Sequence, residues 1–293
     1  DPGNIQLLDS LDAGFTLQDV VAQGDYIYVA TNHNQQELIT LDMSDPQNIT
    51  PVPGGIFNSE GGQDGISVEL DGDRLYLGTR KNTGGHQTCQ QNAELYVLDI
   101  STPAEPTCIG SGQVGRNAND IAVAHNHAYV ATNKGGAQIT AMDLSDLTNI
   151  SVVDTYATPG SGRGVFVYQD RLFAGSDDGS TNHDLFIFDI STPGVLDLHT
   201  SLDTGERVYE VASDGDHIFV SSSVNDAFRV YDFTQDPQIT LLASYNTLGA
   251  CVDMAWDGTH IHLTCSANAQ EYLIIGPQDP PDSYTTEGWF TRS

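Results

Sequence analysis

The sequence predicts an all-β protein built from repeated four-stranded antiparallel sheets. A short apolar run that ends in a turn-forming residue occurs six times, most clearly at Leu95–Asp99 (LYVLD). The other copies are Leu38–Asp42, Ile139–Asp143, Leu185–Asp189, Phe228–Asp232 and the divergent Tyr272–Gly276. Such runs are typical of a strand buried on both faces and are too short for a helix. Their ends recur every ~43 to 57 residues, a period typical of β-propeller blades.

The residues after each run predict a turn and a further strand. The closing Asp is expected to accept a backbone N–H bond in an Asx turn, and a Ser/Thr-x-Pro sequence follows several copies. The next strands are expected at Ile49–Val52, Cys108–Gly110, Ile150–Val153 and Ile239–Leu242. Each run is therefore predicted to be the third strand of a four-stranded unit.

A second repeated pattern lies upstream of each run and predicts the first two strands. Asp120–Ala131 is a clear copy, with two apolar stretches separated by a short polar turn. The equivalent segments begin at Asp19, Ser67, Gly164, Glu210 and Asp253. No segment shows a sustained helical period. Because one such sheet cannot bury both of its faces, the copies are expected to stack radially.

The repeated runs also resemble a known family. LITLD at 38–42 and LYVLD at 95–99 are followed by Ser-Asp-Pro and Ser-Thr-Pro, and this pattern resembles the LVIVD-repeat family of β-propellers. The resemblance extends over about residues 1–276 and implies a propeller fold. It implies no particular activity, because propellers include hydrolases, lyases, lectins and scaffolds.

We expect one propeller domain over residues 1–276, with six blades and seven as the alternative. Residues 1–12 match the stretch that follows the first run, so they are expected to form an outer strand that closes the ring. Residues 277–293 are expected to be a tail. Alternatively, Ser283–Phe290 supplies the last outer strand.

The composition is strongly acidic. Forty Asp and Glu residues against ten Lys and Arg give a net charge of −30. Nucleic acid, anionic membranes and acidic polysaccharides are therefore poor general partners, because the long-range field repels them. Solubility in a salty medium explains this acidity most simply, and cation binding on an acidic face is the alternative. No stretch is long enough for a transmembrane helix.

The four cysteines allow three disulfide pairings. Cys251 opens the inner strand of the last blade and Cys265 ends its hairpin partner, so these two are expected to face each other. Cys89 and Cys108 are then the second pair. Buried free thiols are the alternative. Disulfides would indicate an extracellular, cell-surface or periplasmic location, and the chain, which starts at Asp1, is expected to be a mature secreted or trimmed form.

The candidate site is the face of the propeller where the inner strands begin. Four carboxylates are expected to converge on the channel mouth there, from Asp19, Asp120, Glu210 and Asp253. Three roles are open: accepting backbone N–H bonds at the strand starts, binding a cation such as calcium, or general acid/base catalysis. Candidate ligand-binding residues nearby are Gln18, Asn119, Arg163, Tyr209 and the loop residue His33.

Other motifs carry less weight. His183 next to Asp184 could be a general base oriented by a carboxylate, but adjacent residues in an extended loop point apart. Ser176–Thr181 resembles the Asp-box of sialidase-type propellers and is interpreted as a turn. No phosphate-binding glycine loop, nucleophile elbow or zinc-protease motif is present.

The sequence favours a non-catalytic extracellular module that binds a protein or glycan partner, with no certain cofactor. A hydrolase or lyase with a carboxylate-ringed and calcium-binding site is the alternative. A third hypothesis is a structural subunit that self-associates through residues 1–12 or 277–293.

Overall fold

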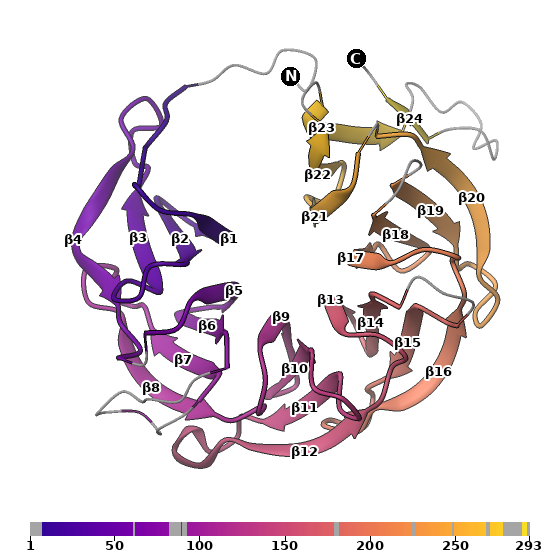
Figure 1. Ribbon diagram of the computed structural model, residues 1–293, viewed down its shortest axis with the longest axis horizontal. Helices are drawn as coiled ribbons and strands as arrows, with labels where there is room; N and C mark the ends of the chain where they lie inside the picture. Colours follow the sequence, from indigo (N-terminus) through magenta and orange to yellow (C-terminus); the bar gives the residue numbers. More distant parts are fainter. Residues whose placement is uncertain are drawn as a thin grey trace. The chain divides into compact units, whose positions relative to one another are not determined.

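The protein is an all-β six-bladed propeller. The computed structural model describes residues 8–60, 62–81, 89, 93–178, 182–223, 227–247, 249–267, 270–277 and 289–291. These residues form six four-stranded antiparallel sheets, which confirms the expected count of six blades and not seven (Figure 1). The chain divides into two compact units, and each unit contains three sheets.

The N-terminal unit comprises Gln6–Ala157 and Pro193–Val195. Its first sheet contains β1 (Leu17–Gln23), β2 (Tyr26–Thr31), β3 (Leu38–Asp42) and β4 (Thr50–Phe57). The second contains β5 (Gly65–Asp71), β6 (Arg74–Thr79), β7 (Leu95–Asp99) and β8 (Thr107–Gly112). The third contains β9 (Ala118–Ala124), β10 (His127–Thr132), β11 (Ile139–Asp143) and β12 (Ser151–Tyr156), with a 3₁₀ turn at Leu147–Asn149.

The C-terminal unit comprises Asp1–Ile5, Thr158–Thr192 and Leu196–Ser293. Its first sheet contains β13 (Gly162–Tyr168), β14 (Arg171–Ser176), β15 (Leu185–Asp189) and β16 (Asp197–Leu202). The second contains β17 (Val208–Ser213), β18 (His217–Ser222), β19 (Phe228–Asp232) and β20 (Thr240–Tyr245). The third contains β21 (Cys251–Trp256), β22 (Ile261–Ala267), β23 (Gln270–Pro277) and β24 (Trp289–Thr291).

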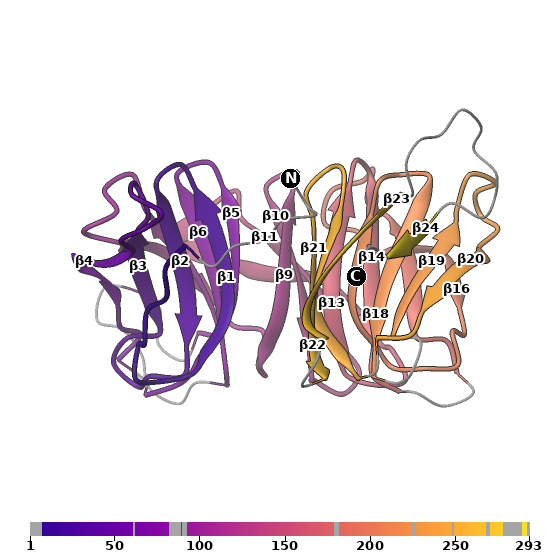
Figure 2. The ribbon, with the colours of Figure 1, turned by 90° about the horizontal axis from the view of Figure 1, so that it is seen from above.

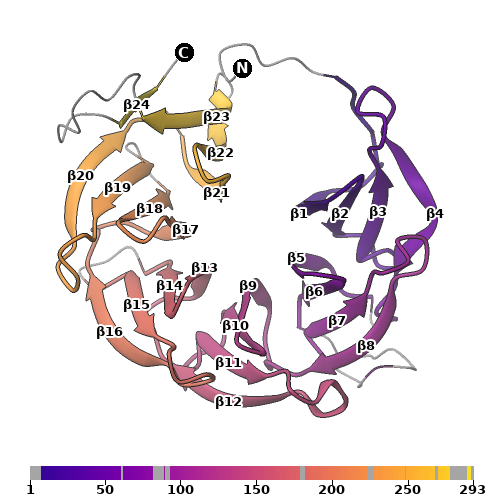
Figure 3. The same ribbon diagram turned by 180° about the vertical axis from the view of Figure 1, so that it is seen from behind.

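Within each unit the first strands of neighbouring sheets lie side by side. In the N-terminal unit β1 contacts β5 and β5 contacts β9 (Figures 1 and 3). In the C-terminal unit β13 contacts β17 and β17 contacts β21. The strands of the first two N-terminal sheets run between the same two ends of their unit (Figure 2). The first strand of each sheet begins at one of these ends, and the loop between the second and third strands lies there too. We name this end the hairpin-loop end.

Five of the six third strands are largely buried, as their sequence predicts, whereas in β23 Tyr272 is 48% exposed and Ile275 is buried. In β7 the residues Leu95–Leu98 are all fully buried. Tyr96 and Leu98 pack in a cluster with residues of the first sheet, whereas Leu95 and Val97 pack with residues of the third sheet. This alternation is the period of two of a strand covered on both faces. Burial of the central strand therefore requires a sheet on each side.

The predicted Asx turns are present after five of the third strands. The side-chain Oδ1 of each closing Asp accepts the backbone N–H of the residue two positions later. The bonds are Asp42–Ser44 at 2.8 Å, Asp99–Ser101 at 2.9 Å, Asp143–Ser145 at 2.8 Å, Asp189–Ser191 at 2.9 Å and Asp232–Thr234 at 2.8 Å. These bonds lower the pKa of all five carboxyls, and Arg171 contributes further at Asp189.

The outer strand of the sixth sheet comes from the C-terminal segment. β24 pairs with β23 through Ile275–Thr291, Gly276–Phe290 and Pro277–Trp289. Residues 289–291 therefore supply the last outer strand, which was the alternative for this segment. Of the predicted closing strand at 1–12, residues 8–12 form no strand and residues 1–7 lie outside the described residues.

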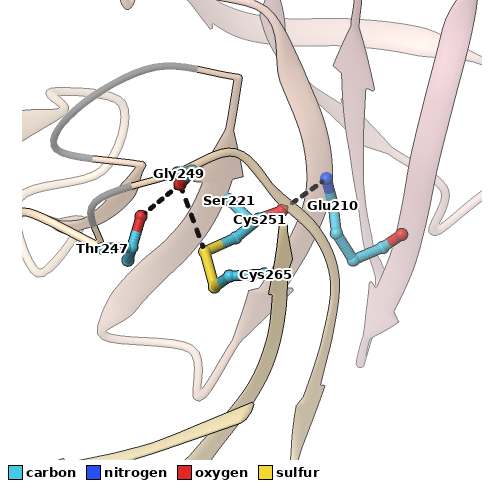
Figure 4. The surroundings of a disulfide bond; sticks show 6 residues. All are labelled: Glu210, Ser221, Thr247, Gly249, Cys251 and Cys265. Atoms are coloured by element: carbon cyan, nitrogen blue, oxygen red, sulfur yellow. Dashed lines mark hydrogen bonds between the residues drawn. A yellow bond between two sulfur atoms is a disulfide. The ribbon is translucent and has the colours of Figure 1, made fainter. Parts of the chain in front are cut away.

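Both expected disulfides are present. Cys251 and Cys265 are directly opposed in the β21–β22 register, with their Cα atoms 3.9 Å apart. Beside them the carbonyl oxygen of Gly249 accepts a 2.5 Å bond from Thr247 Oγ1 (Figure 4). Cys89 and Cys108 form the second bridge, with Cα atoms 6.3 Å apart. The described residues contain no free cysteine.

Candidate functional site

Each inner strand begins with a β-bulge at the hairpin-loop end. The register of the first strand shifts at 17/19, 65/67, 118/120, 162/165, 208/210 and 251/253. A bulge adds an unpaired residue to one strand and redirects its side chain. The residues inside these shifts include Gln18, Asn119, Arg163 and Tyr209, which are four of the five predicted ligand-binding residues. The bulges therefore remove these side chains from the regular pleat.

The four predicted carboxylates follow the bulges and bind the backbone there. Each accepts the N–H of the next residue in its own strand. The bonds are Asp19–Val20 at 2.7 Å, Asp120–Ile121 at 2.8 Å, Glu210–Val211 at 3.1 Å and Asp253–Met254 at 2.7 Å. The N–H of Glu210 itself donates to Ser221 Oγ at 3.1 Å (Figure 4). This is the geometry of backbone acceptors at the strand starts.

The same positions also connect neighbouring sheets. The second oxygen of Asp19 accepts the N–H of Val68, in the next inner strand, at 2.7 Å. Ser67 is the equivalent residue in that strand, and its Oγ donates to the carbonyl of Ala118 at 2.9 Å. Asp19 and Ser67 thus join three consecutive inner strands of the N-terminal unit.

In the C-terminal unit the contact depends on a glycine. A Cβ atom at Gly164 would lie 2.4 Å from Oε1 and 2.7 Å from Cα of Glu210. Glycine is therefore the only residue type at position 164 that leaves room for Glu210 of the next sheet. This explains why one of the six equivalent positions carries no side chain.

Over the described ranges, no three His, Cys, Asp or Glu side chains lie together in a way that could hold a metal ion. Asp19 and Asp120 belong to the N-terminal unit, and Glu210 and Asp253 to the C-terminal unit. Calcium binding and catalysis by these four residues stay predictions.

Glu69 is a carboxylate that the sequence reasoning missed. It lies in β5, two residues after Ser67, and burial raises its pKa to about 7, with a further contribution from the charge of Asp19. The sequence contained a signal, because the equivalent residues in the other blades are apolar. They are Val21, Ala122, Phe166, Ala212 and Ala255. A carboxyl with such a pKa, next to another carboxylate, is able to exchange a proton near neutral pH.

The structure brings together two of the predicted ligand-binding residues. The guanidinium of Arg163 lies 5.5 Å from the ring centroid of Tyr209, and its Nε donates to Asp177 Oδ2 at 2.9 Å. His33 belongs to the N-terminal unit, where its ring lies 5.1 Å from that of Phe15. In the same unit Gln18 is exposed and Asn119 is half-buried. Arg163 and Tyr209 thus form a polar and aromatic surface on β13 and β17.

A second set of acids lies buried immediately before the third strands. Glu37 and Asp184 are fully buried, and Glu94 is 2% exposed. They accept backbone N–H bonds from the loop that leads to the next sheet. The donors are Ser59 for Glu37 at 2.9 Å, Val114 and Gly115 for Glu94 at 3.0 and 2.9 Å, and Thr204 for Asp184 at 2.9 Å. These acids hold the loops of the hairpin-loop end. A Glu, Gln or Asp just before the apolar run is the sequence signal that could have identified them.

The proposed pairing of His183 with Asp184 does not form a base–carboxylate dyad. Asp184 bonds to the loop at Thr204, and burial raises its pKa to about 6. The Nδ1 atom of His183 instead lies 2.5 Å from Ser201 Oγ. The two side chains therefore serve different contacts, as expected for neighbours in an extended loop.

Three hydrogen-bonded side chains in the sixth sheet have the geometry of an oriented base. In the sixth sheet His262 Nε2 lies 2.9 Å from Asp257 Oδ2, and its Nδ1 lies 2.6 Å from the hydroxyl of Tyr272. The other oxygen of Asp257 accepts the N–H groups of Thr259 and His260. With Nε2–H donating to the carboxylate, Nδ1 is able to accept the phenolic proton. No local motif indicates this arrangement, because the pairing of β22 with β23 brings His262 and Tyr272 together.

We predict that Asp19 stabilises the fold through the two backbone groups that it binds. Asp19→Ala leaves the Val68 N–H without its acceptor and should lower the free energy of unfolding by about 1–3 kcal/mol. Asp25→Ala, in the exposed β1–β2 turn, is the matched control and should change it by less than about 0.5 kcal/mol. Urea unfolding followed by tryptophan fluorescence measures both. Equal effects would contradict this role for Asp19.

We also predict that Glu69 makes stability depend on pH near neutrality. Its folded pKa of about 7 lies above its unfolded value, so its contribution is complete below about pH 4 and is lost as the pH rises through 7. The melting temperature of Glu69→Gln minus that of wild type should therefore be larger at pH 8 than at pH 5. Thermal melts across this range test it, with exposed Glu105→Gln as the control. Parallel curves for wild type and Glu69→Gln would rule this contribution out.

Comparison with known proteins supports the fold and the repeat. The LVIVD repeat model matches residues 16–52, 89–113 and 115–158. No functionally curated protein sequence matches the chain. The matched regions coincide with sheets of the N-terminal unit, where the repeated runs were most regular.

Similar solved structures share the fold at very low sequence identity. Candidate 6-phosphogluconolactonases from Bacteroides fragilis and Bacteroides uniformis each give a TM-score of 0.67 at 9% identity. The alignments cover 89% of this chain and 80% and 81% of those chains. The computationally designed protein Ika8 gives a TM-score of 0.53 at 8% identity, covering 86% of this chain and 81% of that one. The resemblance stated from the sequence is confirmed, and the chain is a six-bladed β-propeller that carries LVIVD repeats.

Proposed function

We propose that the protein is a non-catalytic, extracellular binding module whose hairpin-loop end holds a protein or glycan partner. The observation that carries this proposal is the use of the inner-strand carboxylates. Asp19, Asp120, Glu210 and Asp253 each bind a backbone N–H at a bulge. The candidate catalytic groups are thus engaged in holding the strands, and the proposal assigns partner contact to bulged residues beside them.

Arg163 and Tyr209 supply the best-formed contact surface for that partner. The Arg163 side chain is held on both sides, by the ring of Tyr209 and by the carboxylate of Asp177. A side chain fixed before binding loses less conformational entropy when a ligand arrives. Aromatic and guanidinium groups together are suited to the faces and hydroxyls of a sugar or to a polar protein surface.

The cysteines fit an extracellular, cell-surface or periplasmic location. Both pairs of cysteines form disulfides, which persist in oxidising compartments. No helix in the described part of the chain is long and apolar enough to cross a membrane. The disulfides support the proposed location. The net charge of −30 makes nucleic acid a poor general partner.

A hydrolase or lyase is the second candidate function, favoured by one arrangement. Tyr272, His262 and Asp257 have the spacing of an activated hydroxyl, a base and the group that orients the base. Two structures with the same fold carry the name of a lactonase. Self-association through 1–12 or 277–293 is the third, and most of both segments lies outside the described residues.

The proposal is tested by binding and turnover measured on the same variants. Wild type, Arg163→Gln and Tyr209→Ala are titrated against a panel of neutral and acidic oligosaccharides. The control is Arg74→Gln, which lies at the start of β6, at the end of the second sheet opposite the hairpin-loop end. We expect a ligand whose affinity falls at least about tenfold in both site variants and is unchanged in the control. Melting temperatures confirm that each variant is folded.

Turnover decides between the two candidate functions. Wild type is assayed against lactone, ester and glycoside substrates beside Asp120→Asn, Glu210→Gln and His262→Ala. The binding-module proposal expects no activity that these substitutions remove. Hydrolysis by wild type that is lost in any of these folded variants would overturn it.

A further inference from the structure

Three loops of the N-terminal unit meet at its hairpin-loop end around Asn117. The backbone N–H of Lys81, just after β6, donates to Asn117 Oδ1 at 3.0 Å. The N–H of Asn117, just before β9, donates to Asn133 Oδ1 at 3.2 Å. Asn133 lies just after β10 and directly precedes Lys134. These two bonds place Lys81, Arg116 and Lys134 on adjoining loops.

Hydrogen bonds to buried side chains hold two of the loops that carry this cluster. The buried carboxylate of Glu94 accepts the N–H groups of Val114 and Gly115 at 3.0 and 2.9 Å, which fixes the loop that carries Arg116. A Cβ atom at Gly115 would lie 3.5 Å from Lys134 Nζ, so the ammonium group lies over that loop. The N–H of Lys134 donates to the buried Thr132 Oγ1 at 3.1 Å. These bonds hold the backbone beside Arg116 and at Lys134, and the bond to Asn117 holds it at Lys81.

The charge of this cluster is unusual for this protein. Lys81 and Lys134 are the only two lysines among 293 residues, in a chain with 40 acidic and 10 basic side chains. Lys81 and Arg116 are exposed, and Lys134 is half-buried. None of the three forms an ion pair with a carboxylate in the described part of the chain, whereas Arg80 pairs with Asp64, Arg163 with Asp177, and Arg171 with Asp189 and Asp236.

Lys134 Nζ lies over the loop that carries Arg116, and Lys81 is bonded to the same loop through Asn117, so an anion at this place is attracted by all three charges. The oxygens of Asn117 and Asn133 already accept backbone bonds, so their amide N–H groups remain as donors. Lysine, arginine and amide donors together match a carboxylate and the hydroxyls of the ring that carries it.

We propose that Lys81, Arg116 and Lys134, with Asn117 and Asn133, form a binding site for the carboxylate of a short acidic saccharide. The net charge of −30 repels a long polyanion, so the site takes a segment of a few sugars. This inference rests on the proposed binding function but uses residues separate from Arg163 and Tyr209.

The test is a calorimetric titration with tetragalacturonate at about 50 mM NaCl. Its fully methyl-esterified form, which has the same length and no charge, is the ligand control. We expect tetragalacturonate to bind, its affinity to fall at least about tenfold in Lys81→Gln/Arg116→Gln/Lys134→Gln, and the ester to bind at least about tenfold more weakly. Lys81→Arg/Lys134→Arg keeps the charge and should keep the affinity. Arg74→Gln/Arg207→Gln removes two basic charges elsewhere and should also keep it.

Three results would overturn the inference. They are no binding of tetragalacturonate, equal binding by the triple variant, and tighter binding of a tetraglutamate peptide of the same charge, which would assign the site to an acidic protein. Including Arg163→Gln and Tyr209→Ala separates the two proposals. If binding is lost in those two variants but not in the triple variant, the proposed binding function stands and the site at Lys81, Arg116 and Lys134 is ruled out.

Discussion

The structure depends on the burial of a short third strand on both of its faces, as β7 shows. Leu95–Leu98 is fully buried, with alternate side chains in the cores shared with the preceding and the following sheet. Burying four such side chains is favourable by several kcal/mol relative to leaving them exposed. A single blade cannot gain this energy, so the repeat and the radial stacking follow from the same four residues.

Close stacking at the hairpin-loop end creates a second requirement, which the carboxylates meet. Each inner strand begins with a bulge, and a bulge leaves backbone groups unpaired. Asp19 shows how a carboxylate resolves this, with one oxygen on its own strand and the other on the next at 2.7 Å each. Repetition of an acid at this position is therefore explained by the backbone.

Much of this organisation could be predicted from the sequence, because it depends on local patterns. The third strands, the Asx turns and the Cys251–Cys265 pair follow from residue type and spacing. The outer strand of the sixth sheet was harder to predict, since residues 1–12 match the stretch after the first run and Ser283–Phe290 offered a second candidate strand. Glu69 and the buried acids before the third strands break or extend the repeat pattern, and a stricter comparison of equivalent positions would have found them.

Other parts of the site could not have been predicted from spacing. The contact of Arg163 with Tyr209 joins two sheets, and the triad of Asp257, His262 and Tyr272 joins two strands through their register. The cluster around Asn117 depends on side-chain to backbone bonds between three loops. Such contacts are set by tertiary packing, and the repeat gives only the sheets that carry them.

We propose, as the central claim, that the inner-strand carboxylates bind the backbone rather than a cation. A thermal melt of the wild-type protein with EDTA and with added calcium tests it most directly, because a ligand that binds only the native state raises the midpoint. The account predicts the same midpoint in both conditions. A midpoint that rises with calcium in wild type but not in Asp120→Asn would contradict it and identify the carboxylates as metal ligands.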